Sequence, residues 1–341
     1  MSWLGLDVGG ANLKAADGLG WARTVGFPLW REPSELASAI EAMLESAPPA
    51  ERIAVTMTGE LCDCFRTKAE GVRHIVSAVE QAAAPRKVFV CLVEGRLVSP
   101  DEARASPILA AASNWHALAQ FACRFLDGGG GLLVDVGSTT TDIVPLVDGQ
   151  PAPSASTDTE RSIAGELVYA GVERTPVCAI VRSLPWRGAQ CPIAAELFAT
   201  TADVYVTLGM IAEDPDATWT ADGRGLTQGF ARDRLARMIC ADRTTFDDQD
   251  ARRASETVRA AQVNQLIGAL EKAIARMAER PRCVVLSGGG EFLAAEVIAT
   301  GLAPRRLVSL SGELGPEVSR AAPAHALAVL AREAKVGTDG R

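Results

Sequence analysis

Basic runs, long apolar segments and histidines are all scarce in this sequence. Its 34 Lys and Arg residues are outnumbered by 42 Asp and Glu residues, which leaves a net charge of −8. No stretch interleaves basic with aromatic residues, so nucleic acid is not expected as a partner. No segment reaches the ~18 uninterrupted apolar residues that span a bilayer, and the first ten residues form neither a basic nor an apolar leader. We therefore expect a cytoplasmic protein without a membrane partner.

Metal-binding clusters of cysteine and histidine are also lacking. The eight cysteines are scattered, their one close pair is Cys62 and Cys64, and the chain has three histidines. A closed zinc site needs four ligands in clustered spacings, which this pattern does not offer. Reduced, mostly buried thiols are the expected state of these cysteines.

What the chain does contain is an ordinary globular composition arranged as alternating strands and helices. Its 341 residues are 48% hydrophobic, enough for two domains that each bury a core. The apolar run 2–8 ends in Gly9-Gly10 and is followed by a shorter alternating segment, typical of a β-hairpin. Further strands are predicted at 21–27, 52–59 and 87–93, and helices at 33–44, 69–83 and 106–126, which indicates an α/β fold.

An internal repeat divides the chain. The segment LDVGGAN (6–12) matches VDVGSTT (134–140), which superposes Asp7 on Asp135 at an offset of 128 residues. A glycine run at 127–131 lies between the copies. We expect a first lobe over 1–130, a second lobe over 131–320, and a C-terminal helix with a tail over 321–341. In the second half the pattern predicts polar insertions at 149–160 and 212–229, helices at 230–240 and 250–280, a strand, glycine turn and helix over 283–299, and a last strand at 306–310.

Three glycine turns, each directly after an apolar strand, could bind phosphate. Glycine lets backbone N–H groups approach an anion, and the helix expected after the third turn adds a favourable dipole. One such turn alone is more often a structural hairpin. Asp7 and Asp135, at the strand ends, could hold Mg²⁺. The phosphate candidates in and beside the turns are Gly9, Gly10, Asn12, Lys14, Gly137, Ser138, Thr139, Thr140, Gly288, Gly289 and Gly290.

Two acidic strand-turn motifs at domain spacing, followed by the third turn, resemble the superfamily that includes actin, heat-shock chaperone ATPases and sugar or acetate kinases. This resemblance implies a duplicated RNase H-like α/β fold, with two lobes around a central cleft.

Further segments resemble the hydantoinase/oxoprolinase-like branch linked to tetrahydromethanopterin-dependent one-carbon transfer. The resemblance implies a transferase of methanofuran or methylofuran biosynthesis. Such an enzyme joins an aminomethylfuran-methyl diphosphate to a glutamyl-tyramine or tyrosine-type phenol, which gives an aryl ether and pyrophosphate. The segments that carry the resemblance are MTGELCDCFRTKAEGV (57–72), AASNWHALA (111–119), DVGSTTTDIVPL (135–146), GVERTPVCAI (171–180), ELFATTADVY (196–205) and ADGRG (221–225).

That reaction needs a base for the phenol proton, and four residues are candidates. Each also has a structural interpretation. Glu60 and Asp63 could cap a turn, Asp142 could end its strand, and His116 lies in an apolar helix where a hydrogen-bonded core position is the commoner role.

Two polar residues are candidates for binding the substrates. Lys68 could bind phosphate oxygens or be merely solvated. Asn114 is predicted in the middle of a helix, where asparagine is unfavourable. It would either face a substrate or be a buried amide satisfied by nearby backbone.

Two other functions fit the same fold. In one, the chain is a kinase or ATPase that binds ATP with the third turn near the adenosine and the two aspartates around the phosphates. In the other, it is a nucleotide-gated scaffold. The long insertions typical of polymer-forming relatives are not evident, and we favour the transferase.

Overall fold

The computed structural model describes residues 2–334, and the tail expected at 337–341 lies outside them. The first lobe is built on a six-stranded sheet in the order β3-β2-β1-β4-β5-β6. β1 runs parallel to β4 and antiparallel to β2, and all six of its residues are buried. A strand buried on both faces reads as a continuous apolar run, and here Asp7 is the one charged exception. The strands are β1 (Trp3–Val8), β2 (Asn12–Ala16), β3 (Ala22–Gly26), β4 (Arg52–Met57), β5 (Lys87–Cys91) and β6 (Leu97–Val98).

The second lobe repeats this arrangement. Its sheet has the order β10-β8-β7-β13-β14, with the short β9 paired to β8. β7 runs antiparallel to β8 and parallel to β13, as β1 does to β2 and β4. The expected duplicated α/β fold with two lobes is therefore confirmed. The strands are β7 (Gly131–Val136), β8 (Thr141–Val147), β9 (Gln150–Pro151), β10 (Leu167–Val168), β13 (Cys283–Ser287) and β14 (Arg306–Ser309).

The internal repeat also holds in the strand register. Asp7 lies opposite Lys14 in the first hairpin, and Asp135 lies opposite Asp142 in the second, at the same offset of 128 residues. Both hairpins close with the same backbone hydrogen bond: Gly9 N donates to Asn12 O at 3.0 Å, and Gly137 N donates to Thr140 O at 2.9 Å. Lys14 and Asp142 therefore occupy equivalent positions with opposite charge.

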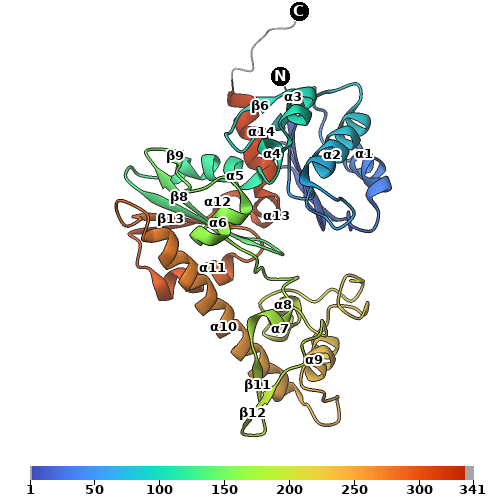
Figure 1. The fold of residues 1–341 in the computed structure, drawn as a ribbon, viewed down its shortest axis with the longest axis vertical. Coiled ribbons are helices and arrows are strands. Elements are labelled where there is room, and N and C mark those ends of the chain that lie inside the picture. Colours follow the sequence, from blue (N-terminus) through green and yellow to red (C-terminus); the bar gives the residue numbers. More distant parts are fainter. Residues whose placement is uncertain (1, 335–341) are drawn as a thin grey trace, which may run out of the picture.

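Helices cover the sheets and connect the lobes (Figure 1). The core of the first lobe includes the buried faces of α1 (Leu36–Glu45) and α2 (Lys68–Ala83). α14 (Ala322–Glu333) packs against both β1 and α5 (Asn114–Ala122), so the last helix returns to the first lobe. The other helices outside the insertion are η1 (Pro33–Glu35), α3 (Pro100–Ala105), α4 (Pro107–Ala110), η2 (Cys123–Phe125), α6 (Asp158–Ala164), α11 (Glu291–Gly301), α12 (Leu310–Leu314) and α13 (Pro316–Arg320).

The helix predicted over 106–126 is wrong as a single element. The chain breaks at Ala112, whose φ of +49° is a left-handed conformation. The following Ser113 is buried and its hydroxyl lies 2.8 Å from that of Thr56 on β4. α5 then starts at Asn114, whose Oδ1 accepts a hydrogen bond from the Trp115 N–H at 2.7 Å. Asn114 is therefore at a helix start, where asparagine is favourable, and not in a helix interior.

A separate insertion extends from the second lobe (Figure 1). The long α10 reaches from this insertion back to the sheet, where its buried residues join the core of the second lobe. Within the insertion, Arg234 is fully buried and pairs with Asp203 and Asp222. The sequence pattern predicted its two longer helices, at 230–240 and 250–280, but not its other elements. Its elements are α7 (Val177–Ile180), β11 (Ser183–Trp186), β12 (Ala189–Pro192), α8 (Thr201–Thr207), α9 (Gln228–Arg237) and α10 (Asp248–Ile274).

None of the helices in residues 2–334 combines the length and the apolar character needed to cross a membrane.

The close packing of α14 on β1 gives a test of the fold. A Cβ on Gly5 would overlap the Ala324 carbonyl oxygen, whereas a Cβ on Gly26 would meet no atom within 4 Å. We expect Gly5→Ala to lower the free energy of unfolding by about 2 kcal/mol, because the helix must shift away from the strand. Gly26→Ala, the matched control on an edge strand, should change it by less than about 0.5 kcal/mol. Urea denaturation followed by circular dichroism measures both, and equal stabilities would contradict this packing.

Candidate active site

Two aspartates, one at the end of β1 and one at the end of β7, lie close enough for their charges to interact. Asp7 is buried, and its Oδ2 lies 3.5 Å from Lys14 Nζ. The positive charge of Lys14 also lowers the pKa of Asp135 in the second lobe, while the negative charge of Asp7 raises it. The two hairpins therefore face each other closely enough for their charges to interact, as the repeat predicted.

Burial makes these carboxylates costly to ionise. Desolvation raises the pKa of Asp7 above its ordinary value, against the opposing effect of Lys14. Desolvation and the nearby Asp142 raise the pKa of Asp135 to about 6. A bound cation would relieve this cost, since oxygen ligands with little other compensation favour Mg²⁺.

The pair also fits the way in which magnesium is normally held. Asp7 Oδ1 is buried and has no hydrogen-bond partner among the described residues. No three His, Cys, Asp or Glu side chains in residues 2–334 are grouped so as to hold a metal by themselves. Mg²⁺ commonly takes only one or two carboxylates and completes its shell with substrate phosphates and water. Asp7 and Asp135 suit such a site.

The glycine turns pack backbone against backbone around Asp135. Gly288 has a φ of +89°, and a Cβ there would lie 2.8 Å from Asp135 Oδ1. The turn at 137–140 is held by Val172 N, which donates to Gly137 O at 3.1 Å, and by Glu173 N, which donates to Ser138 O at 3.1 Å. The third turn leads into α11. Gly137 and Gly288 are half-buried and Gly289 is exposed, so part of the backbone of these turns is accessible to a ligand such as phosphate.

Asp142 is held in an ion pair that limits its use as a base. Arg161 Nη2 donates to Asp142 Oδ1 at 2.8 Å, and the Arg161 side chain is 1% exposed. The guanidinium also stacks over the Trp115 ring, with its carbon 4.0 Å from the ring centroid. This contact between α6 and α5 covers one face of Trp115, which is buried in the core.

Glu60 is the one predicted base that is both buried and incompletely paired. It follows Gly59, whose N–H donates to Val8 O at 3.0 Å, so it lies beside the first hairpin turn. The side chain is 1% exposed, and Oε2 has no hydrogen-bond partner among the described residues. Burial raises its pKa to about 7, with Lys68 and two backbone amides acting in the opposite direction. A carboxylate in this state can accept a proton near neutral pH.

The remaining candidates have different surroundings. Asp63 is exposed on the loop after Glu60. Lys68 Nζ lies 2.7 Å from Asp158 Oδ2 and so joins the first lobe to the second. Asn114 is partly buried at the start of α5. The other turn residues, Gly10, Asn12, Thr139, Thr140, Gly289 and Gly290, lie in or beside the three turns as expected.

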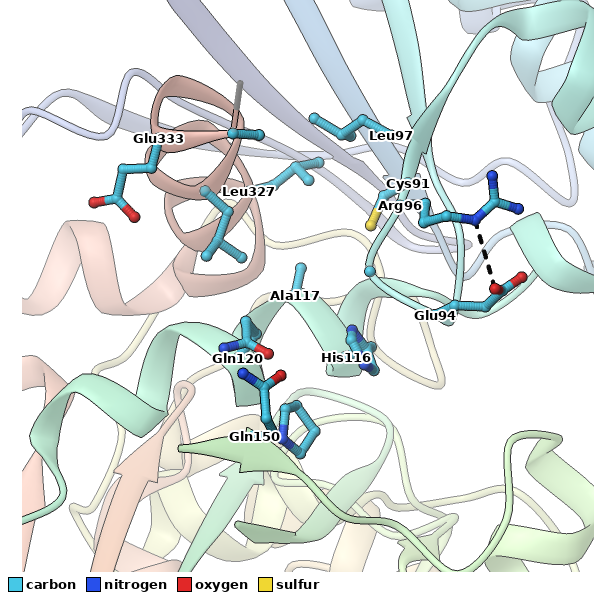
Figure 2. Close-up of a pocket in the computed structure, with 14 residues that line it drawn as sticks. Cys91, Glu94, Arg96, Leu97, His116, Ala117, Gln120, Gln150, Leu327 and Glu333 are labelled. Atoms are coloured by element: carbon cyan, nitrogen blue, oxygen red, sulfur yellow. Dashed lines mark ion pairs between the residues drawn. The ribbon is translucent and has the colours of Figure 1, made fainter. Parts of the chain in front are cut away.

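His116 points into a different cavity (Figure 2). This cavity of about 700 Å³ is lined by parts of α5 and α14, by the segment after β5 and by β9. Its lining includes none of the cleft carboxylates Asp7, Glu60, Asp135 and Asp142. Burial and the charge of Arg161 lower the pKa of His116, which favours a neutral imidazole.

Sequence reasoning missed Arg161, Asp158 and Glu173. Asp158 lies in a segment interpreted as a polar insertion, Glu173 lies in a segment that carries the resemblance, and Arg161 lies in neither. A signal was present: Thr157 and Glu160 have the spacing of a helix N-cap, and Gly165 ends the helix with a φ of +80°. The Thr157 side chain indeed accepts a hydrogen bond from Glu160 N. That signal would have predicted α6 and thereby placed Arg161 on a helix close to β8.

Comparison with known proteins identifies the family to which this chain belongs. The hydantoinase/oxoprolinase family model matches residues 51–333. The chain belongs to the hydantoinase/oxoprolinase family. Within it, the chain is 33% identical over 333 residues to the (4-{4-[2-(gamma-L-glutamylamino)ethyl]phenoxymethyl}furan-2-yl)methanamine synthase of Methanocaldococcus jannaschii, and this match covers 96% of each protein. A synthase of the same name from Methanococcus vannielii is 29% identical over 204 residues, covering 58% of this chain and 89% of the relative.

These relatives make the chain a biosynthetic enzyme of the synthase type. Among solved structures, the nucleotide-free form of an ATP-dependent acetone carboxylase is similar with a TM-score of 0.55. At 12% identity, covering 96% of this chain and 70% of the carboxylase, this likeness shows the fold alone.

The uncompensated charge at Asp135 predicts a gain in stability when it is removed. The folded-state pKa of about 6 lies above the ordinary value of 3.8, so the folded protein holds more protons between these pH values. Stability associated with this group is then lost as pH rises through 4 to 6. In metal-free buffer we expect Asp135→Asn to raise Tm by at least ~2 °C at pH 7.5 and to match wild type near pH 4. Asp63→Asn, at an exposed position without an ion pair among the described residues, is the control and should change neither value. A lower Tm for Asp135→Asn at pH 7.5 would show that the carboxylate is a structural partner.

Proposed function

We propose that this chain is an ether-forming transferase that joins a furfuryl carbon to a phenol oxygen and releases pyrophosphate. The relatives' printed name describes a phenoxymethyl furan, a product that contains this ether bond. The observation that carries the proposal is the placement of Glu60 beside the first hairpin turn. A buried carboxylate able to accept a proton near pH 7 lies next to the turns suited to a diphosphate.

The donor, an aminomethylfuran-methyl diphosphate, reacts at its furfuryl carbon. The bond from this carbon to the diphosphate oxygen breaks, and its electron pair leaves with pyrophosphate. The furan ring stabilises positive charge at the carbon as the bond lengthens. A bond from the phenol oxygen to the same carbon forms, and the phenol proton moves to Glu60. Atoms and charge balance without a nucleotide or a redox partner.

Side-chain and backbone groups of this chain would act on both the leaving diphosphate and the phenol. Lys14 and the backbone N–H groups of the turns at 137–140 and 288–290 would bind the diphosphate oxygens, where negative charge develops. Mg²⁺ held by Asp7 and Asp135 would supply further counter-charge there when bound. Glu60, beside the first turn, would orient the phenol and take its proton. The acceptor is a glutamyl-tyramine or tyrosine-type phenol.

The proposal predicts ether formation without ATP. Purified protein, Mg²⁺, the furan diphosphate and either glutamyl-tyramine or a tyrosine-containing acceptor should give the ether, detected by mass spectrometry. The rate should rise with pH through about 7, because Glu60 must be ionised to accept the proton. Glu60→Gln should lower it by at least ~100-fold.

Asp63→Asn is the matched control, since Asp63 lies on the same loop but is exposed. It should retain most of the wild-type rate, with circular dichroism confirming that both variants are folded. No ether from either acceptor, together with rapid hydrolysis of ATP by the wild type, would assign the chain to the kinase or ATPase class instead.

A further inference from the structure

An ion pair joins the two lobes at the predicted base. Lys68 is the first residue of α2 in the first lobe, and Asp158 is the first residue of α6 in the second. Their charged atoms lie 2.7 Å apart, and each side chain is 26% exposed. Because these residues are 90 positions apart in sequence and on different lobes, the contact depends on how the lobes are placed.

The same ammonium group also lies near Glu60. Lys68 Nζ is 3.9 Å from Glu60 Oε1, too far for a good hydrogen bond but within range of a strong charge interaction. Lys68 therefore has two acidic neighbours, and in this structure Asp158 has the shorter contact. The groups that face Glu60 are Lys68 from α2, Asp158 from α6, Cys62 from its own loop and the backbone amide of Ala112 before α5.

We propose that Asp158 is a positioning residue that holds Lys68 away from Glu60, so that the base is free only when the lobes are closed. This inference rests on the proposed function, in which Glu60 accepts the phenol proton. If the lobes separate, Asp158 moves away with the second lobe and Lys68 is left with Glu60 as its acidic neighbour. A direct charge-assisted hydrogen bond would then stabilise the ionised carboxylate and make it a weaker base.

The proposed reaction requires that the base act only when water is excluded from the site. A furfuryl cation reacts readily with water, so the base and the leaving-group site should be competent only in a closed cleft. The contact of Asp158 with Lys68 and the approach of the second-lobe turns to the first-lobe hairpin both depend on the same placement of the lobes. The ion pair between Lys68 and Asp158 thereby links the relative position of the lobes to the basicity of Glu60.

The test measures the titration of Glu60 directly and needs no substrate. Protein labelled with ¹³C at the glutamate side-chain carboxyl is titrated by NMR, and the Glu60 resonance is assigned as the one lost in Glu60→Gln. We expect a wild-type midpoint near 7. Asp158→Asn should lower the midpoint by at least ~0.5 pH unit, because Lys68 turns to Glu60. Lys68→Met should raise it, because the nearest positive charge is removed, and Asp158→Glu should restore the wild-type value.

A double variant separates the action through Lys68 from the direct effect of the Asp158 charge. If Asp158 acts through Lys68, Asp158→Asn in the Lys68→Met background should shift the midpoint by less than half as much as it does alone. Equal shifts in both backgrounds, or no shift in either single variant, would overturn the inference. The expected midpoints together with an absence of ether would support this device and reject the proposed reaction. Ether formation with unchanged Glu60 midpoints would support the proposed reaction and reject this device.

Discussion

Buried carboxylates carry negative charge where the equivalent hairpins of the two lobes approach each other. The rest of this structure depends on how that charge is offset. Two equivalent hairpins bring Asp7 and Asp135 together, and Asp142 lies next to Asp135 in the register of β7 and β8. Lys14 and Arg161 offset this charge only in part, since burial still raises the pKa of all three acids. We propose that this cluster serves to bind a ligand, since a magnesium diphosphate would bring both the missing positive charge and the oxygens that the turns could bind.

The duplicated fold was open to prediction from sequence because its signals are local. Each lobe begins with an apolar strand, an aspartate and a glycine turn, and the offset between the copies equals the spacing of the two hairpins in the structure. In the insertion around α7 to α10, the longer helices α9 and α10 were predicted, whereas the short elements α7, β11, β12 and α8 were not. The insertion also contains ion pairs between residues distant in sequence, such as Arg234 with Asp203 and Asp222, which no local pattern indicates. The break at Ala112 also escaped prediction, since a left-handed alanine is set by tertiary packing and has no sequence signal.

The site likewise contains residues that local sequence signals predict and residues whose contacts depend on tertiary structure. Asp7, Asp135, Lys14 and the turn residues follow from the repeat, whereas their relation to Glu60, Lys68 and Asp158 depends on how the lobes meet. His116 and its neighbour Trp115 on α5 have different surroundings, because consecutive helical residues point about 100° apart. Trp115 therefore lies under Arg161, while His116 lines the separate cavity (Figure 2).

We propose that the site formed by Asp7, Asp135 and Lys14 binds a diphosphate leaving group and not a nucleotide. Calorimetric titration of magnesium pyrophosphate and of magnesium ATP into the wild-type protein and Lys14→Met tests this most directly. We expect saturable binding of magnesium pyrophosphate to the wild type, at least ~10-fold weaker binding to Lys14→Met, and much weaker binding of magnesium ATP to both. Tight binding of magnesium ATP with no binding of magnesium pyrophosphate would contradict it.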